Sequence, residues 1–184
     1  MKREEKVAFE EDMFIASEIP LIIDTYDDIF SDFDPRPYHT RALSDDFLYE
    51  ARKATRDKKP EAILIKFLVP ERIRSVANEI LIRKRLKEHF RKHYLLLLEE
   101  HGRIKKRAIS LIFIGMSMIV IASYMFTVGT NSFLLHLLRI LLEPGGWFLG
   151  WTGLDQLFYT VEEHKKDLQF YEKMSRSKIM FISS

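Results

Sequence analysis

The sequence has no cysteine and few glycines, and both shortages limit the chemistry that it supports. The lack of cysteine excludes disulfides, thiolate zinc sites, cysteine-ligated iron–sulfur clusters and a cysteine nucleophile. Of 7 glycines in 184 residues, only Gly102 precedes residue 108, so the charged part cannot form a multi-glycine phosphate cradle. There is no Walker loop and no Gly-x-Ser-x-Gly elbow. We therefore expect a protein without enzyme activity, cofactor or metal.

Charged side chains are missing from one long segment. The stretch 108–138 holds 31 residues without Asp, Glu, Lys or Arg, although 30% of the whole chain is charged. At about 1.5 Å per residue, its first part can cross a hydrocarbon core of roughly 30 Å. The sequence therefore predicts a membrane-spanning helix over 108–128. This span follows a charged segment of about a hundred residues, so it is not a cleaved signal peptide.

A second apolar segment, 133–159, follows a short polar turn at 129–132 and predicts a return span. Its charged residues and helix breakers are Arg139, Glu143, Asp155, Pro144, Gly145 and Gly146. A proline followed by two glycines predicts a broken helix, either as a kink for packing or as a binding site of the transporter type. Alternatively, Gly145, Gly146, Gly150 and Gly153 allow another helix to approach closely.

Basic residues near the span ends predict the orientation. Lys and Arg are retained on the cytoplasmic side of a membrane, and the predicted turn between the spans has none. The residues expected to contact lipid headgroups before the first span are Arg103, Lys105, Lys106 and Arg107. Five more basic residues follow between Lys165 and Lys178. We expect a multi-pass protein of the cell membrane with both termini in the cytoplasm.

The predicted fold class is α+β, a small cytoplasmic mixed domain with a two-helix transmembrane hairpin inserted before the C-terminal helix and strand. The cytoplasmic domain covers 1–107, the hairpin 108–160, and the returning helix and strand 161–184. Residues 1–60 carry 15 acidic and 10 basic side chains, and residues 61–107 carry 6 and 13. The basic excess therefore lies next to the predicted membrane, as suits an anionic leaflet.

Hydrophobic periodicity predicts the elements of this domain. Strands are expected at 7–15, 19–23, 62–69 and 178–182, and helices at 44–57, from 71 onward and at 162–175. The run 62–69 is nearly all apolar and predicts a central strand buried on both faces. The apolar segment 178–182 is expected to join the same sheet. The long helix beginning near 71 is expected to break at Gly102.

The strongest candidate site is a polar stripe in the second span. His136, Arg139 and Glu143 are spaced by three and four residues, so they share one helical face among leucines. Ionisable groups at membrane depth are costly and often mark ion or proton pathways. Three alternatives remain: Arg139 pairs with Glu143 in the helix, pairs with a neighbouring subunit, or snorkels to the interface.

Other polar clusters favour structural roles. The acidic segment 24–34 lacks the ligand spacing of an EF-hand, and His89 and His93 lack a His-Glu-x-x-His sequence. The basic run 83–92 lies near the predicted membrane entry and carries no base-reading motif, so we expect no nucleic-acid partner.

One part of the chain resembles a known group of proteins. The segment 26–37 reads Tyr-Asp-Asp-Ile-Phe-Ser-Asp-Phe-Asp-Pro-Arg-Pro and precedes Arg-Ala-Leu-Ser at 41–44. Together with the two-span hairpin and its aromatic-rich second span, it resembles an uncharacterised family of small two-span prokaryotic membrane proteins. The resemblance covers most of the chain. It implies the same architecture and no transferable activity.

These features lead to one leading hypothesis and one alternative. The first is a homo-oligomeric scaffold, or an accessory subunit of a larger membrane complex, with lipids and copies of itself as partners. The alternative is an oligomeric ion channel or ion-coupled transporter lined by the polar stripe.

The predicted topology is testable by labelling. Single cysteines placed at Thr130 and Ser175 are expected to react with an impermeant maleimide from opposite sides of sealed vesicles. The native chain, which has no cysteine, is the blank. Labelling of both positions from one side would disprove the two-span hairpin.

Overall fold

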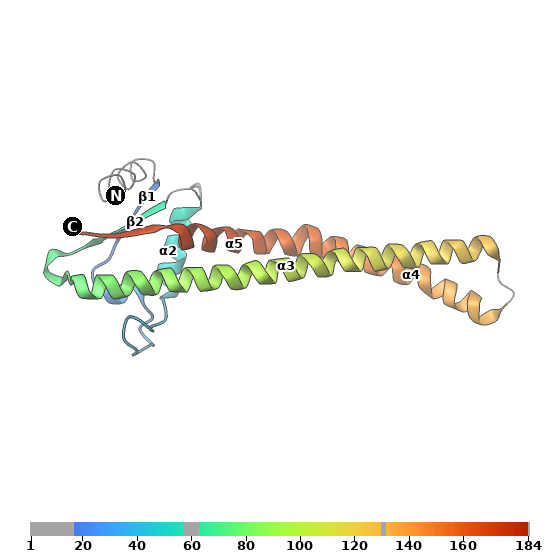
Figure 1. The fold of residues 1–184 in the computed structure, drawn as a ribbon, viewed down its shortest axis with the longest axis horizontal. Helices are drawn as coiled ribbons and strands as arrows, with labels where there is room; N and C mark the ends of the chain where they lie inside the picture. The colour runs from blue at the N-terminus through green and yellow to red at the C-terminus, as the bar shows by residue number, and fades with distance from the viewer. Residues whose placement is uncertain (1–16, 57–62, 130–131, 184) are drawn as a thin grey trace, which may run out of the picture. The chain divides into compact units, whose positions relative to one another are not determined.

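A computed structural model describes residues 17–56, 63–129 and 132–183. The described chain is mostly helical, with one small sheet, and divides into two compact units (Figure 1). The sheet unit comprises Met1–Leu95 and Leu168–Ser184, and the hairpin unit comprises Leu96–Asp167. The strand predicted at 7–15 lies outside the described residues.

The sheet consists of three parallel strands in the order β1-β2-β3. They are β1 (Ser17–Ile22), β2 (Ile63–Val69) and β3 (Lys178–Ser183). Leu64 and Ile65, which point to opposite faces, are each 1% exposed, so the prediction that β2 is buried on both faces is confirmed. The register pairs Phe67 of β2 with Phe181 of β3, which confirms that the C-terminal apolar segment joins the sheet.

Helices connect the strands. The bounds are η1 (Tyr26–Ile29), α2 (Asp45–Thr55), η2 (Glu71–Ile73), α3 (Val76–Val128), α4 (Phe133–Asp155), the π-helical turn η3 (Gln156–Thr160) and α5 (Val161–Arg176). α2 lies in the crossover from β1 to β2, as parallel strands require. The connection from β2 to β3 contains α3, α4 and α5, and therefore the whole hairpin unit.

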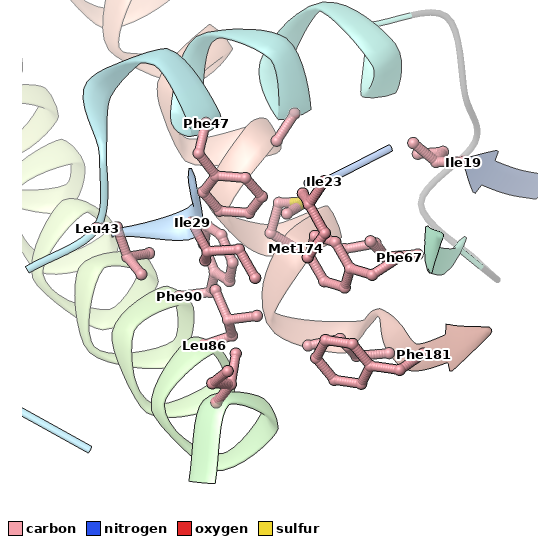
Figure 2. Packing of buried hydrophobic residues seen from close by; sticks show 14 of the residues in the cluster. Ile19, Ile23, Ile29, Leu43, Phe47, Phe67, Leu86, Phe90, Met174 and Phe181 are labelled. Carbon is pink, nitrogen blue, oxygen red and sulfur yellow. The ribbon is translucent and has the colours of Figure 1, made fainter. Parts of the chain in front are cut away.

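The core of the sheet unit is built on the aromatic residues of β2 and β3 (Figure 2). The rings of Phe67 and Phe181 stack with their centroids 5.2 Å apart, and Phe47 of α2 lies 5.9 Å from Phe67. Phe90 of α3 meets Phe170 of α5 edge to face at 6.2 Å. The helices α2, α3 and α5 therefore each contribute a large side chain to one hydrophobic core.

Two expected helix interruptions are absent, so the predicted breaks are wrong, while a kink at Pro144 stays a prediction. α3 continues through Gly102, because one glycine costs only about 1 kcal/mol in a helix and strong helix formers surround it. α4 continues through Pro144, Gly145 and Gly146. Proline lacks a backbone N–H, so one hydrogen bond of the helix is lost at Pro144. Breaking the helix would leave several more backbone groups without hydrogen bonds in an apolar segment, which costs more. The irregularity occurs later, in the π-helical turn η3.

A buried polar network lies at the carboxyl end of the sheet. Glu79 is 5% exposed and accepts hydrogen bonds from Arg74 Nε at 2.9 Å, Arg74 Nη2 at 3.0 Å and the Tyr26 hydroxyl at 3.0 Å. Arg74 also donates to Ser183 Oγ and the Phe181 carbonyl, both at 3.2 Å. The network therefore joins the segments that follow β1 and β2 to the end of β3.

The same bonds determine the ionisation of Glu79. Burial raises its pKa, but the hydrogen bonds from Arg74 and Tyr26 outweigh burial, so the pKa of Glu79 is lowered. A carboxylate with a lowered pKa in the folded state stabilises the fold at neutral pH and loses this contribution as the pH falls below its unfolded value, about 4.3.

The role of β3 in the core predicts a large effect of a single substitution. Phe181→Ala is expected to lower the free energy of unfolding of the sheet unit by about 3–5 kcal/mol, because it empties a buried aromatic site. The measurement is thermal or denaturant unfolding of the detergent-solubilised chain. The matched control is Phe33→Ala, at a phenylalanine that is 98% exposed, which is expected to change stability by less than about 0.5 kcal/mol. Equal effects of the two substitutions would contradict the packing of β3.

Candidate functional site in the helical hairpin

The hairpin unit contains apolar helices whose large side chains point outward. α3 and the helical stretch that begins at Phe133 are each long and apolar enough to cross a membrane. Phe113, Val120 and Phe148 are 62–73% exposed, as are many neighbours on both helices. Soluble monomers rarely expose so much contiguous apolar surface, so this surface is suited to lipid or to a protein partner.

A row of small residues brings α3 and α4 into backbone contact, and we call it the glycine seam. A Cβ built on Gly115 would lie 2.6 Å from the Gly146 carbonyl oxygen and 2.7 Å from the Gly150 nitrogen. A Cβ on Gly153 would lie 2.7 Å from the Ala108 carbonyl oxygen. No real Cβ tolerates such distances, so the two helices approach this closely because these residues are glycine. The expectation that glycines of the second span allow close helix approach is confirmed for Gly146 and Gly153.

The polar stripe continues the glycine seam along the same face of α4. Arg139, Glu143, Gly146, Gly150 and Gly153 follow one another at spacings of four, three, four and three, which keeps them on one side of a helix. The seam therefore changes from glycine to ionisable residues toward the start of α4.

A cleft opens where the stripe begins. It has a volume of about 430 Å³ and is lined by Arg139, Glu143 and Trp147 of α4 together with residues of α3. Those α3 residues are Ile119, Ala122, Ser123 and Phe126. The Arg139 guanidinium lies over the Phe126 ring, 4.3 Å from its centroid, a cation–π contact within one hairpin. His136 does not line this cleft and is exposed.

Arg139 and Glu143 do not form an ion pair with each other. Among the described residues no nitrogen–oxygen contact within 4.0 Å joins them, and Glu143 is exposed. The alternative in which they neutralise one another within the helix is therefore not observed. The polar stripe presents one cation, Arg139, which contacts an aromatic ring, and one anion, Glu143, which is exposed.

The residues expected to contact headgroups lie on exposed positions of α3. Arg103, Lys105, Lys106 and Arg107 directly precede Ala108, where the seam begins, and all four are exposed. Arg103 forms one weak surface pair, with its Nη2 3.8 Å from Glu99 Oε1. The rest of this basic group is accessible to an anionic surface.

The acidic segment 24–34 stabilises its own loop. Asp28 accepts hydrogen bonds from the backbone of Asp24 and Thr25 at 2.8 and 3.0 Å, which starts η1. Asp34 pairs with Arg36 at 2.7 Å. Within the part of the chain that the structure describes, no group of three metal-ligating side chains gathers here or elsewhere.

His89 and His93 form an aromatic contact with α5. Their ring centroids are 4.3 Å apart, and His93 stacks on Tyr171 at 5.3 Å. Burial, with the nearby charges of His93, Arg85 and Lys92, lowers the pKa of His89 to about 4. The pKa of His93 is also lowered, mainly by burial, so both imidazoles favour the neutral form and pack beside Tyr171 as aromatic groups.

Sequence reasoning did not identify the network of Tyr26, Arg74 and Glu79. Its members lie up to 53 positions apart, and each is an ordinary polar residue in its local context. One sequence pattern could have indicated the network. Tyr26 and Arg74 follow predicted strands and Glu79 begins the next helix, and polar side chains often meet at the carboxyl ends of parallel strands.

Comparison with known proteins adds no family assignment. No family model, curated protein or solved structure matches the chain. The resemblance to two-span prokaryotic membrane proteins stays a prediction.

The glycine seam predicts which glycines tolerate a methyl group. Gly115→Ala and Gly153→Ala are expected to destabilise the hairpin by about 1–3 kcal/mol, because the new Cβ would meet backbone atoms. Gly150→Ala is the matched control, because a Cβ there meets nothing within 4 Å. Both tryptophans, Trp147 and Trp151, lie in α4, so their fluorescence during unfolding in detergent reports on the hairpin alone. If all three variants unfold together, the close contact is wrong.

Proposed function

We propose that this chain is a non-enzymatic integral membrane protein that assembles with copies of itself and serves as a scaffold or as an accessory subunit of a membrane complex. Its hairpin spans the cell membrane, and both termini lie in the cytoplasm. The sheet unit is then the cytoplasmic part that presents surfaces to other proteins.

A single observation carries the proposal of self-assembly: Arg139 and Glu143 lie on an apolar hairpin without pairing to each other. An arginine at the centre of a spanning helix costs about 2.5–3.5 kcal/mol on insertion scales, and the cost is smaller nearer the helix end, where the polar stripe lies. The Phe126 ring offsets part of this cost for Arg139, but nothing in the described hairpin offers a cation to Glu143. A second copy supplies both opposite charges, because the polar stripe of each hairpin carries one arginine and one glutamate.

Symmetry makes such a pairing self-complementary. In a two-fold dimer, Glu143 of one copy meets Arg139 of the other, and the same contact recurs on the opposite side. The cleft that both residues line gives the partner side chain a place to enter. A reciprocal pair of this kind also fixes the register of the two hairpins.

The scaffold role is favoured by the filled interior of the hairpin. α3 and α4 are in backbone contact along the glycine seam, which leaves no continuous polar path between them there. The polar stripe lies near the start of α4. Its three ionisable residues cover only a short part of the span, which is too short for a proton or ion pathway across the membrane.

A channel or ion-coupled transporter is the second candidate. It is favoured by the cleft itself, because two ionisable side chains on an apolar hairpin line a cavity of about 430 Å³. In that case His136, Arg139 and Glu143 of several copies surround one pathway.

The exposed basic group Arg103, Lys105, Lys106 and Arg107 supports the proposed membrane orientation. Each basic residue near an anionic leaflet contributes about 1 kcal/mol of attraction. Headgroup binding by these residues holds the start of the first span at the cytoplasmic interface.

The proposed assembly predicts a rescue. Glu143→Gln is expected to weaken self-association in nanodiscs or mild detergent by about tenfold or more, because it strands Arg139, and adding Arg139→Leu is expected to restore it. Native mass spectrometry or light scattering measures the oligomeric state. Asp155→Asn, at an exposed carboxylate on the same helix, is the control and is expected to have no effect.

Two outcomes would refute parts of this proposal. If Glu143→Gln assembles like the parent, the stripe does not hold copies together. If the parent conducts ions in reconstituted vesicles and the double variant assembles without conducting, the channel candidate replaces the scaffold.

A further inference from the structure

The segment between Phe30 and Leu43 is a closed loop with a defined structure. These two residues form an antiparallel bridge, in which Ser31 N donates to the Ala42 carbonyl at 3.0 Å and Ser44 N donates to the Ile29 carbonyl at 3.0 Å. The loop follows β1 and η1 at the carboxyl end of the parallel sheet, the edge at which α/β proteins bind ligands. Compact surface loops closed in this way are frequently functional.

Two arginines of this loop are held in place by carboxylates. Asp34 accepts from Arg36 Nε at 2.8 Å and Arg36 Nη2 at 2.7 Å, and it also accepts from the Ala42 amide at 2.6 Å. The Arg36 guanidinium lowers the pKa of Asp34 well below its usual range, so this pair stays ionised. The clamp leaves Arg36 Nη1 without a partner within the described chain.

Arg41 is fixed from three directions. Its Nε donates to the Ser31 carbonyl at 3.2 Å, its Nη1 pairs with Asp27, and its backbone carbonyl accepts from Arg85 Nε at 2.9 Å. Its side chain is 15% exposed, so little freedom remains. The second terminal nitrogen, Nη2, has no partner in the described residues.

A cleft of about 330 Å³ lies beside these guanidiniums, and we call it the loop cleft. It is lined by residues 36–39 and Arg41 of the loop and by Asn78 and Leu81 of α3. No Asp or Glu is among these described lining residues. Asp27 and Asp34 bind the two arginines from outside the cleft. The side chains of His39 and Asn78 make no hydrogen bond within the described chain, so both are available to a ligand.

We propose that the loop cleft binds a small molecule that carries a phosphate group. Preorganised arginine donors suit the geometry of phosphate oxygens, and His39 and the Asn78 amide add further donors. Asp27 and Asp34 balance the charges of the two arginines. The phosphate would therefore be recognised through hydrogen bonds from fixed donors and not through a net positive charge.

The size of the cleft limits the ligand. Pockets for small molecules and cofactors measure roughly 300–1,000 Å³, so the loop cleft is at the small end of that range. A free phosphate would leave much of it empty, whereas a phosphorylated small molecule fills it with its body against Pro37 and Leu81. A lipid headgroup presents the same phosphate chemistry from a membrane surface. The proposal does not depend on self-assembly or on the scaffold role.

The test uses the full chain in phosphatidylcholine nanodiscs with inorganic pyrophosphate as the probe. Titration calorimetry at constant ionic strength is expected to show saturable binding to the parent chain, with chloride as the non-binding reference. His39→Glu places a carboxylate in the loop cleft and is expected to weaken binding at least tenfold. Asn78→Leu removes a neutral donor and is expected to weaken binding less. Lys84→Glu, at an exposed basic residue of α3 outside the cleft, is the surface-charge control. It lowers the net charge more than His39→Glu does, and it is expected to bind like the parent.

The outcomes separate the sources of the phosphate group. Pyrophosphate binding that survives unchanged in anionic phosphatidylglycerol nanodiscs identifies a soluble ligand. Pyrophosphate binding to the parent chain that is lost in those nanodiscs identifies a headgroup that occupies the cleft. The proposal is overturned if the parent does not bind pyrophosphate, or if His39→Glu and Lys84→Glu weaken binding equally. Circular dichroism of each variant establishes that its fold is retained.

Discussion

The pairing of β2 with β3 is the constraint on which the rest of the structure depends. β2 is buried on both faces and has a neighbour on each side, and one of those neighbours comes from beyond both long apolar helices. A chain that leaves the sheet at Val69 must therefore return to it at Lys178. If the intervening helices cross a membrane, the number of crossings must be even, because both ends belong to one sheet. An even number of crossings also places the basic residues that flank the two spans on one side of the membrane, as their distribution predicts.

Within the hairpin, one face of α4 holds both the glycines that pack against α3 and the ionisable residues of the polar stripe. The glycine seam gives close backbone contact and therefore van der Waals attraction, which is the main source of helix association in an apolar environment. The stripe continues that face with side chains too large for such contact, so the cleft forms where the glycines end. The position of Arg139 on Phe126 follows from this change of residue size.

The fold was more predictable from sequence than the sites. The strands at 19–23, 62–69 and 178–182 and the helix at 44–57 were found within a few residues of β1, β2, β3 and α2, because hydrophobic periodicity reports directly on burial. Gly102 and Pro144 misled the prediction, since intrinsic propensity is weak compared with the need to satisfy backbone groups in a long helix.

The sites depend on contacts between distant residues. Of the predicted stripe, Arg139 and Glu143 line one cleft, whereas His136 lies outside it. The contact of Arg139 with Phe126 depends on the neighbouring helix and could not be read from the spacing. The loop cleft was missed because its parts, residues 36–41 and Asn78 with Leu81, are about 40 positions apart. The acidic residues near it were assigned a structural role, and in the fold Asp27 and Asp34 hold arginines.

The parallel pairing of β3 also has a consequence for biosynthesis. Leu64 pairs with Lys178, a separation of 114 positions, so the sheet has a very non-local contact at its centre. During translation β2 is made before the two apolar helices, and its β3 side stays uncovered until both have been synthesised. Non-local parallel pairing is slow and exposes apolar edges to aggregation. The sheet unit can therefore close only after the hairpin has left the ribosome, which makes its maturation a late event that follows hairpin synthesis.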